Sequence, residues 1–176
     1  YDIVLAANRK VFELAHPGAY YYQMHNEAAR VIAEGLRSLG LMRGNMEDAV
    51  AVGAQALFMP HGLGHQMGLD VHDMENIGEK YVGYDEETLR SSTPGLSSLR
   101  MGKRLREGHV ITVEPGIYLE GRFGVRTENM VLVTEDGYMD LTGLYQFCQG
   151  PRIPRLRRHT DRGQHVDHPI RQPAVG

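Results

Sequence analysis

Hydrophobic residues recur with helical spacing in the first third of the chain. The stripe over Ile3–His16 predicts one amphipathic helix, which a Pro-Gly pair ends. A second stripe predicts a helix over Met24–Leu39, with Gly40 as the residue that follows its C-cap. A third helix is predicted over Asn45–Leu57, because Asn45 is a favourable N-cap and acidic residues follow it.

The second half of the chain has the pattern of strands. His109–Glu114 and Val125–Thr134 are rich in β-branched residues, and a tight turn separates the second run from a short strand over Tyr138–Leu141. Residues 79–107 lose periodicity and gain Ser, Thr, Pro and Gly, which predicts a long loop. Helices followed by strands predict an α+β layer, rather than a doubly wound parallel sheet.

Composition narrows the class of protein. The 176 residues are 41% hydrophobic and 23% charged, as expected for a globular domain with a real core. A net charge of −3 gives no general attraction to nucleic acid, and no apolar run is long enough to span a membrane. The single cysteine, Cys148, favours a reducing, cytoplasmic location. The chain begins inside a predicted helix without an initiator Met, so we expect it to be a piece of a longer protein.

The C-terminal part differs from the rest, and we divide the chain into a domain over 1–143 and a tail over 144–176. Six arginines against two aspartates give Pro151–Gly176 a charge of +4, whereas 13 basic and 20 acidic residues give the preceding part −7. Four of the eight prolines also lie there, and large apolar residues are few. Such a segment buries too little apolar surface to offset its ordering entropy, so we predict a disordered, solvated tail.

A histidine- and glycine-rich stretch, Phe58–Asp73, is the first candidate for chemistry. His61 and His65 have the spacing of a zincin helix, but Gly62, Gly64 and Gly68 disfavour a helix and the zincin glutamate is absent. In an extended chain, His61, Leu63 and His65 would share one face. The stretch alone fits two interpretations equally well, a metal and substrate site or a glycine loop with solvated histidines.

Two glutamates add to this candidate site. Glu114 ends a strand, and Glu128 falls two residues after Arg126 inside the predicted strand Val125–Thr134. Alternation along that strand puts Glu128 among core side chains, where a carboxylate needs a cation. Taken alone, an Arg126–Glu128 pair at a solvent-facing edge is the simpler interpretation. Together with His65, the carboxylates favour a divalent metal such as Mn, Co or Zn.

Three ordered motifs, residues 61–73, 112–118 and 124–129, resemble the catalytic half of the pita-bread metallopeptidases. The similarity covers Tyr1–Thr142 and is greatest to the Xaa-Pro aminopeptidase (aminopeptidase P) and Xaa-Pro dipeptidase (prolidase) branch. It implies the C-terminal half of the pita-bread (creatinase/aminopeptidase) fold, with helices packed on a curved, mainly antiparallel sheet.

The resemblance also implies a metal centre. Its metal ligands match His65, Glu114 and Glu128, and Glu114 also matches the residue that shuttles a proton. The family site holds two divalent metals, for which we expect manganese, with cobalt or zinc as alternatives. Two further ligands are aspartates upstream of the opening helix, on strands that this chain lacks. Three ligands could hold one metal weakly.

The same resemblance implies a substrate site and a function. His72 matches a histidine that contacts substrate and steadies the tetrahedral intermediate, His61 a histidine of the substrate pocket, and Arg126 an arginine that supports the carboxylates. The implied function is metal-dependent hydrolysis of Xaa-Pro peptides, whose second residue is proline. A homodimer is compatible with the resemblance. The alternatives are a peptide- or protein-binding member without activity, a metal-free hydrolase like creatinase, and an inactive fragment.

Overall fold

The computed structural model describes residues 1–143, so the predictions for the tail lie outside the described residues. Its helices are α1 (Asp2–Leu14), α2 (Tyr21–Ser38) and α3 (Met46–Ala51), with short 3₁₀ helices at Ala54–Leu57 and Glu79–Val82. Its strands are β1 (Gln66–Met67), β2 (Val110–Val113), β3 (Gly116–Leu119), β4 (Phe123–Arg126), β5 (Asn129–Thr134) and β6 (Gly137–Asp140).

The strands form two antiparallel units. One sheet has the order β1-β2-β5-β6, and a separate two-stranded ribbon consists of β3 and β4. In the larger sheet Ile111 of β2 lies opposite Val131 of β5, and β6 returns beside β5 through a tight turn. The α+β architecture with an antiparallel sheet is therefore confirmed.

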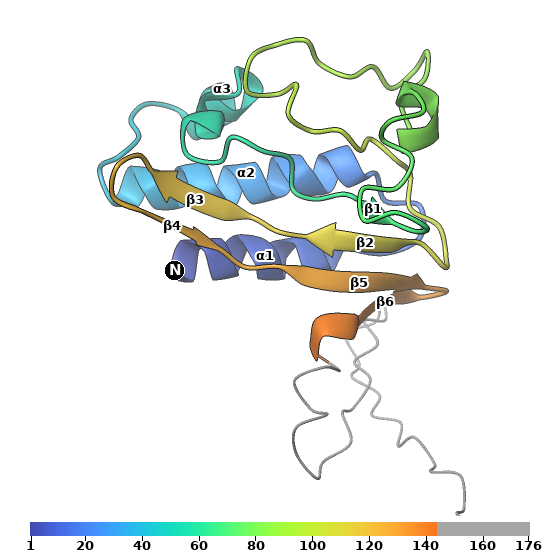
Figure 1. The fold of residues 1–176 in the computed structure, drawn as a ribbon. Coiled ribbons are helices and arrows are strands. Elements are labelled where there is room, and N and C mark those ends of the chain that lie inside the picture. Colours follow the sequence, from blue (N-terminus) through green and yellow to red (C-terminus); the bar gives the residue numbers. More distant parts are fainter. Residues whose placement is uncertain (144–176) are drawn as a thin grey trace, which may run out of the picture.

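Helices α1 and α2 pack side by side and cover one face of the strands (Figure 1). Because the apolar stripes of both helices meet the inward side chains of β2 and β5, one continuous core results. Its fully buried members include Val4, Ala7, Val11, Ala28, Ile32, Leu36, Ile111, Val113, Val131 and Val133. None of the helices within residues 1–143 combines the length and the hydrophobicity needed to cross a membrane.

The three predicted helices are present, but α2 begins at Tyr21, three residues before the predicted start, and the third helix is shorter than predicted. Gly40 follows α2 with φ of +74°, and the Asn45 side chain caps α3 by accepting a hydrogen bond from the Glu47 N–H at 2.8 Å. Helix α3 ends at Ala51, short of Leu57, because Gly53 takes a left-handed φ of +76° and a 3₁₀ turn follows.

The prediction of one continuous strand over Val125–Thr134 is wrong. Two residues, Thr127 and Glu128, separate β4 from β5, because β4 pairs with β3 while β5 pairs with β2. The core face of β5 carries Val131 and Val133, and Glu128 is exposed. The prediction that its carboxylate lies among core side chains is therefore also wrong.

Candidate active site

The histidine- and glycine-rich stretch runs as an extended chain beside β2. The Glu114 N–H donates to the carbonyl of Leu63 at 2.8 Å, and the Thr112 N–H donates to that of His65 at 2.9 Å. Leu63 enters the core, whereas His61 and His65 line a cavity of about 430 Å³. The prediction that these three side chains share one face is therefore correct for the two histidines and wrong for Leu63. A Cβ at Gly64 would lie 2.5 Å from the Thr112 hydroxyl, which explains why glycine is needed there.

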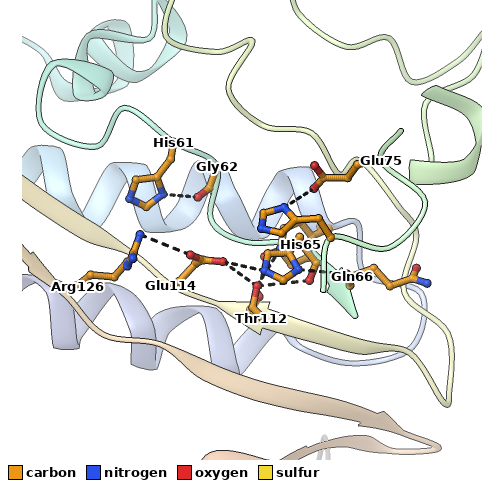
Figure 2. A network of polar contacts seen from close by, with 10 residues as sticks. His61, Gly62, His65, Gln66, Glu75, Thr112, Glu114 and Arg126 are labelled. Atoms are coloured by element: carbon orange, nitrogen blue, oxygen red, sulfur yellow. Dashed lines mark hydrogen bonds and ion pairs between the residues drawn. The ribbon is translucent and has the colours of Figure 1, made fainter. Parts of the chain in front are cut away.

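His65 and Glu114 form the centre of this cavity. The Nε2 atom of His65 lies 3.5 Å from Oε1 of Glu114, and both side chains are largely buried (Figure 2). Since Nδ1 of His65 lies 3.1 Å from the carbonyl of Gln66, which can only accept, the proton belongs on Nδ1. The Nε2 lone pair is thereby directed toward Glu114, as a metal ligand would require.

Both oxygens of Glu114 have partners. The Thr112 hydroxyl donates to Oε1 at 2.9 Å, and Nη1 of Arg126 lies 3.8 Å from Oε2 (Figure 2). The same Thr112 oxygen accepts the backbone N–H of His65 at 2.9 Å. Arg126 thus pairs with Glu114, and no Arg126–Glu128 ion pair occurs among the described residues. Glu128 lines the same cavity from the connection between β4 and β5.

Two further histidines border the cavity. His61 donates from Nδ1 to the Gly62 carbonyl at 2.7 Å, and its Nε2 accepts from the Tyr118 hydroxyl at 3.0 Å. The ring of His72 stacks on that of His65, with centroids 4.0 Å apart and planes 18° apart. The structure therefore brings all the predicted site residues to one cavity.

The sequence analysis missed the residues that support this site. Thr112 and Tyr118 lie within the second motif, so their position was visible although their contacts were not. Glu75 and Arg100 also line the cavity, and they come from the loop region without a periodic pattern. Only the spacing of Glu75, three residues after His72, hinted at an interaction.

Two side chains of helix α2 bond the backbone of the segments that carry the site residues. Tyr21 donates its hydroxyl to the carbonyl of Thr112 at 2.7 Å, and Nδ1 of His25 accepts the N–H of Leu63 at 3.2 Å. Burial, and secondarily the neighbouring His61, lower the pKa of His25 from 6.5 to about 4, so its imidazole is neutral at pH 7. Burial also raises the pKa of the Tyr21 hydroxyl, with the nearby Glu114 acting in the same direction.

The donor set is chemically suited to a divalent metal, but it is incomplete. An imidazole with its lone pair free and a carboxylate oxygen 3.5 Å away could both reach one ion. Among residues 1–143, however, no three His, Cys, Asp or Glu side chains form a group that could hold a metal. The predicted third ligand, Glu128, shares the cavity without completing such a group.

Comparisons with known proteins identify the family. The model of metallopeptidase family M24 matches residues 1–135, so the chain belongs to this metal-dependent family. Human Xaa-Pro dipeptidase is 37% identical over 168 residues, covering 81% of this chain and 33% of its own length. Rat Xaa-Pro dipeptidase is 45% identical over 118 residues, covering 67% and 23%.

Solved structures establish the fold. Proline aminopeptidase P II from Yersinia pestis matches with a TM-score of 0.65 and 34% identity, over 81% of this chain and 30% of its own. Zinc-substituted E. coli aminopeptidase P in complex with product matches with a TM-score of 0.63 and 30% identity, over the same shares. The described residues thus form part of the pita-bread fold, and the chain spans about a third or less of these relatives.

Proposed function

We propose that this chain provides catalytic-site residues of an exopeptidase that hydrolyses Xaa-Pro bonds, of the aminopeptidase P or Xaa-Pro dipeptidase type. The observation that supports it best is the 3.5 Å approach of His65 to Glu114 in a cavity that also holds His61, His72 and Arg126. The relatives named above supply the substrate class, peptides with proline at the second position.

In this proposal His65, Glu114 and Glu128 contribute ligands to a divalent metal, manganese being the expected ion and cobalt or zinc the alternatives. When bound, such an ion supplies an activated water and a polarised carbonyl. Thr112 fixes Oε1 of Glu114, whereas Oε2 has only the longer 3.8 Å contact with Arg126. Oε2 is therefore the atom at which Glu114 takes up a proton.

The two bordering histidines have different proposed roles. Both nitrogens of His61 are occupied, by Gly62 and Tyr118, so His61 shapes the substrate pocket and transfers no proton in this arrangement. His72 is 62% exposed and directs Nδ1 toward Glu75. In the doubly protonated form of the ring, Nε2 then donates to the charge that develops on the substrate.

A second candidate is a peptide-binding member of the same fold without activity. The observation in its favour is that, within residues 1–143, no three His, Cys, Asp or Glu side chains form a group that could hold a metal. The two candidates differ in what they predict for turnover, because binding alone needs no activated water.

A peptide-release assay with excess Mn²⁺ separates the candidates. We expect the 176-residue chain to hydrolyse Xaa-Pro peptides very slowly or not at all. Extending it upstream through aspartate-bearing strands, if the gene encodes them, should restore turnover. Glu114→Ala should then abolish turnover, whereas Glu79→Ala, which removes an acid paired with Arg90 outside the cavity, should not. An inactive extended chain that still binds peptide would favour the second candidate, and rapid turnover by the short chain would contradict the assigned ligands.

A further inference from the structure

Glu75 is turned inward from a segment that otherwise faces solvent. Most residues from His72 to Tyr81 are exposed, yet the side chain of Glu75 is only 8% exposed. The preceding residue, Met74, has φ of +67° and is the one non-glycine residue with positive φ in the described part of the chain. A side chain in this left-handed region is disfavoured, so the surrounding contacts must hold this turn in place.

Two basic groups hold the buried carboxylate. Oε1 of Glu75 lies 3.4 Å from Nδ1 of His72, and Oε2 lies 3.4 Å from Nε of Arg100. One oxygen therefore faces each partner, which offsets the cost of burying the charge. All three residues line the same cavity as His65 and Glu114.

The contact with His72 connects Glu75 to the centre of the site. His72 is largely exposed, and an exposed ring is ordinarily free to change rotamer. Here its ring stacks on that of His65, with centroids 4.0 Å apart, while its Nδ1 lies 3.4 Å from Oε1 of Glu75. Among the described residues, the ion pair with Glu75 and the stack on His65 hold the ring of His72, so removing Glu75 would leave the stack alone.

We propose that Glu75 is a positioning residue, which holds His72 stacked on His65 and keeps Arg100 at the rim of the cavity. This inference rests on the proposed function, since it assigns Glu75 to the ordering of the substrate-contacting wall. A neighbouring pair provides the contrast. Glu79 also bonds an arginine, Arg90, at 2.8 Å, but Glu79 is 55% exposed and lies outside the cavity.

The test is the NMR contact between the two imidazole rings in the 176-residue chain. The wild type should give ring-to-ring NOEs between His65 and His72. Glu75→Ala should lose them, and Glu75→Gln should retain part, because the amide keeps one acceptor oxygen but cannot serve both partners. Glu79→Ala should leave them unchanged. If Glu75→Ala fails to fold, the isosteric Glu75→Gln decides alone, and unchanged NOEs in the folded variant overturn the proposal.

A kinetic measurement tests the consequence for catalysis in whichever form of the protein hydrolyses Xaa-Pro peptides. Glu75→Ala should lower kcat by about 10-fold or more, as loss of a supporting partner commonly does, with a smaller change in KM. Failure of every form to hydrolyse peptides would refute the proposed function, while the NOEs would still decide the role of Glu75. An unchanged kcat in an active form would overturn the inference alone.

Discussion

The hydroxyl of Thr112 donates to Oε1 of Glu114 at 2.9 Å while it accepts the backbone N–H of His65. One buried side chain thus joins the strand that carries the carboxylate to the segment that carries the imidazole. Because Thr112 is only 1% exposed, solvent cannot replace either bond.

Thr112→Val should therefore destabilise the fold by about 1–3 kcal/mol, since it leaves a buried N–H and a carboxylate oxygen without partners. Thr112→Ser keeps the hydroxyl, so its loss of stability should be much smaller. Urea denaturation of the two variants and the wild type measures the difference. Equal stability of the valine and serine variants would mean that the hydroxyl is not needed.

His25 predicts a specific pH dependence of stability. Its pKa falls from 6.5 in the unfolded chain to about 4 in the folded chain, so the unfolded state binds more protons between these values. This contribution to stability is fully present above pH 6.5 and is lost as the pH falls toward 4. The shift corresponds to about 3 kcal/mol.

The measurement is the free energy of unfolding between pH 7 and pH 4. His25→Gln should be less stable at pH 7 and should show a flatter pH dependence than the wild type. His16→Gln, at an exposed histidine, provides the control and should retain the slope of the wild type. A parallel slope in His25→Gln would show that other groups cause the acid sensitivity.

Gly64 tolerates no side chain. A Cβ there would lie 2.5 Å from the Thr112 hydroxyl and 2.6 Å from that of Tyr21, both of which are engaged in buried hydrogen bonds. Gly64→Ala should cost about 3 kcal/mol, at the upper end of overpacking effects. At Gly40 nothing lies within 4 Å of the added Cβ. Gly40→Ala should therefore cost about 1–2 kcal/mol, the penalty for a non-glycine residue with a left-handed backbone. Thermal unfolding of both variants tests this order.

Tyr118 fixes the ring of His61 through one hydrogen bond. Tyr118→Phe should preserve the edge-to-face ring contact at 5.4 Å and remove the donor to Nε2. We expect a loss of about 0.5–1.5 kcal/mol in stability, together with new mobility of the His61 ring in NMR relaxation. Tyr81→Phe, at the exposed Tyr81, should change neither quantity.

Local patterns predicted the elements that are fixed by local physics. The stripes of α1 and α2, the Asn45 cap and strand β2 all depend on side chains within a few residues of each other. The break at Thr127–Glu128 depends on which strands pair, and alternation along one strand contains no information on a change of partner.

The supporting residues escaped prediction for a similar reason. Tyr21 is 91 residues from Thr112, and His25 is 38 residues from Leu63, so their bonds appear only once the helix is docked on the sheet. In the sequence His25 belongs to an ordinary amphipathic helix, and Tyr21 lies three residues before the predicted start of that helix. The identities of His65 and Glu114 were visible from motifs, whereas the means by which they are oriented were not.

Tyr21 and His25 are one helical turn apart, and each contacts a different one of the two segments that form the site. The pitch of an α-helix, about 5.4 Å, therefore sets the spacing between the two side chains that bond the Thr112 carbonyl and the Leu63 amide. Rotating α2 by one residue, about 100°, would withdraw both side chains together. An insertion or deletion within this turn of α2 would thus misalign the two segments, even though it changes no residue that lines the cavity.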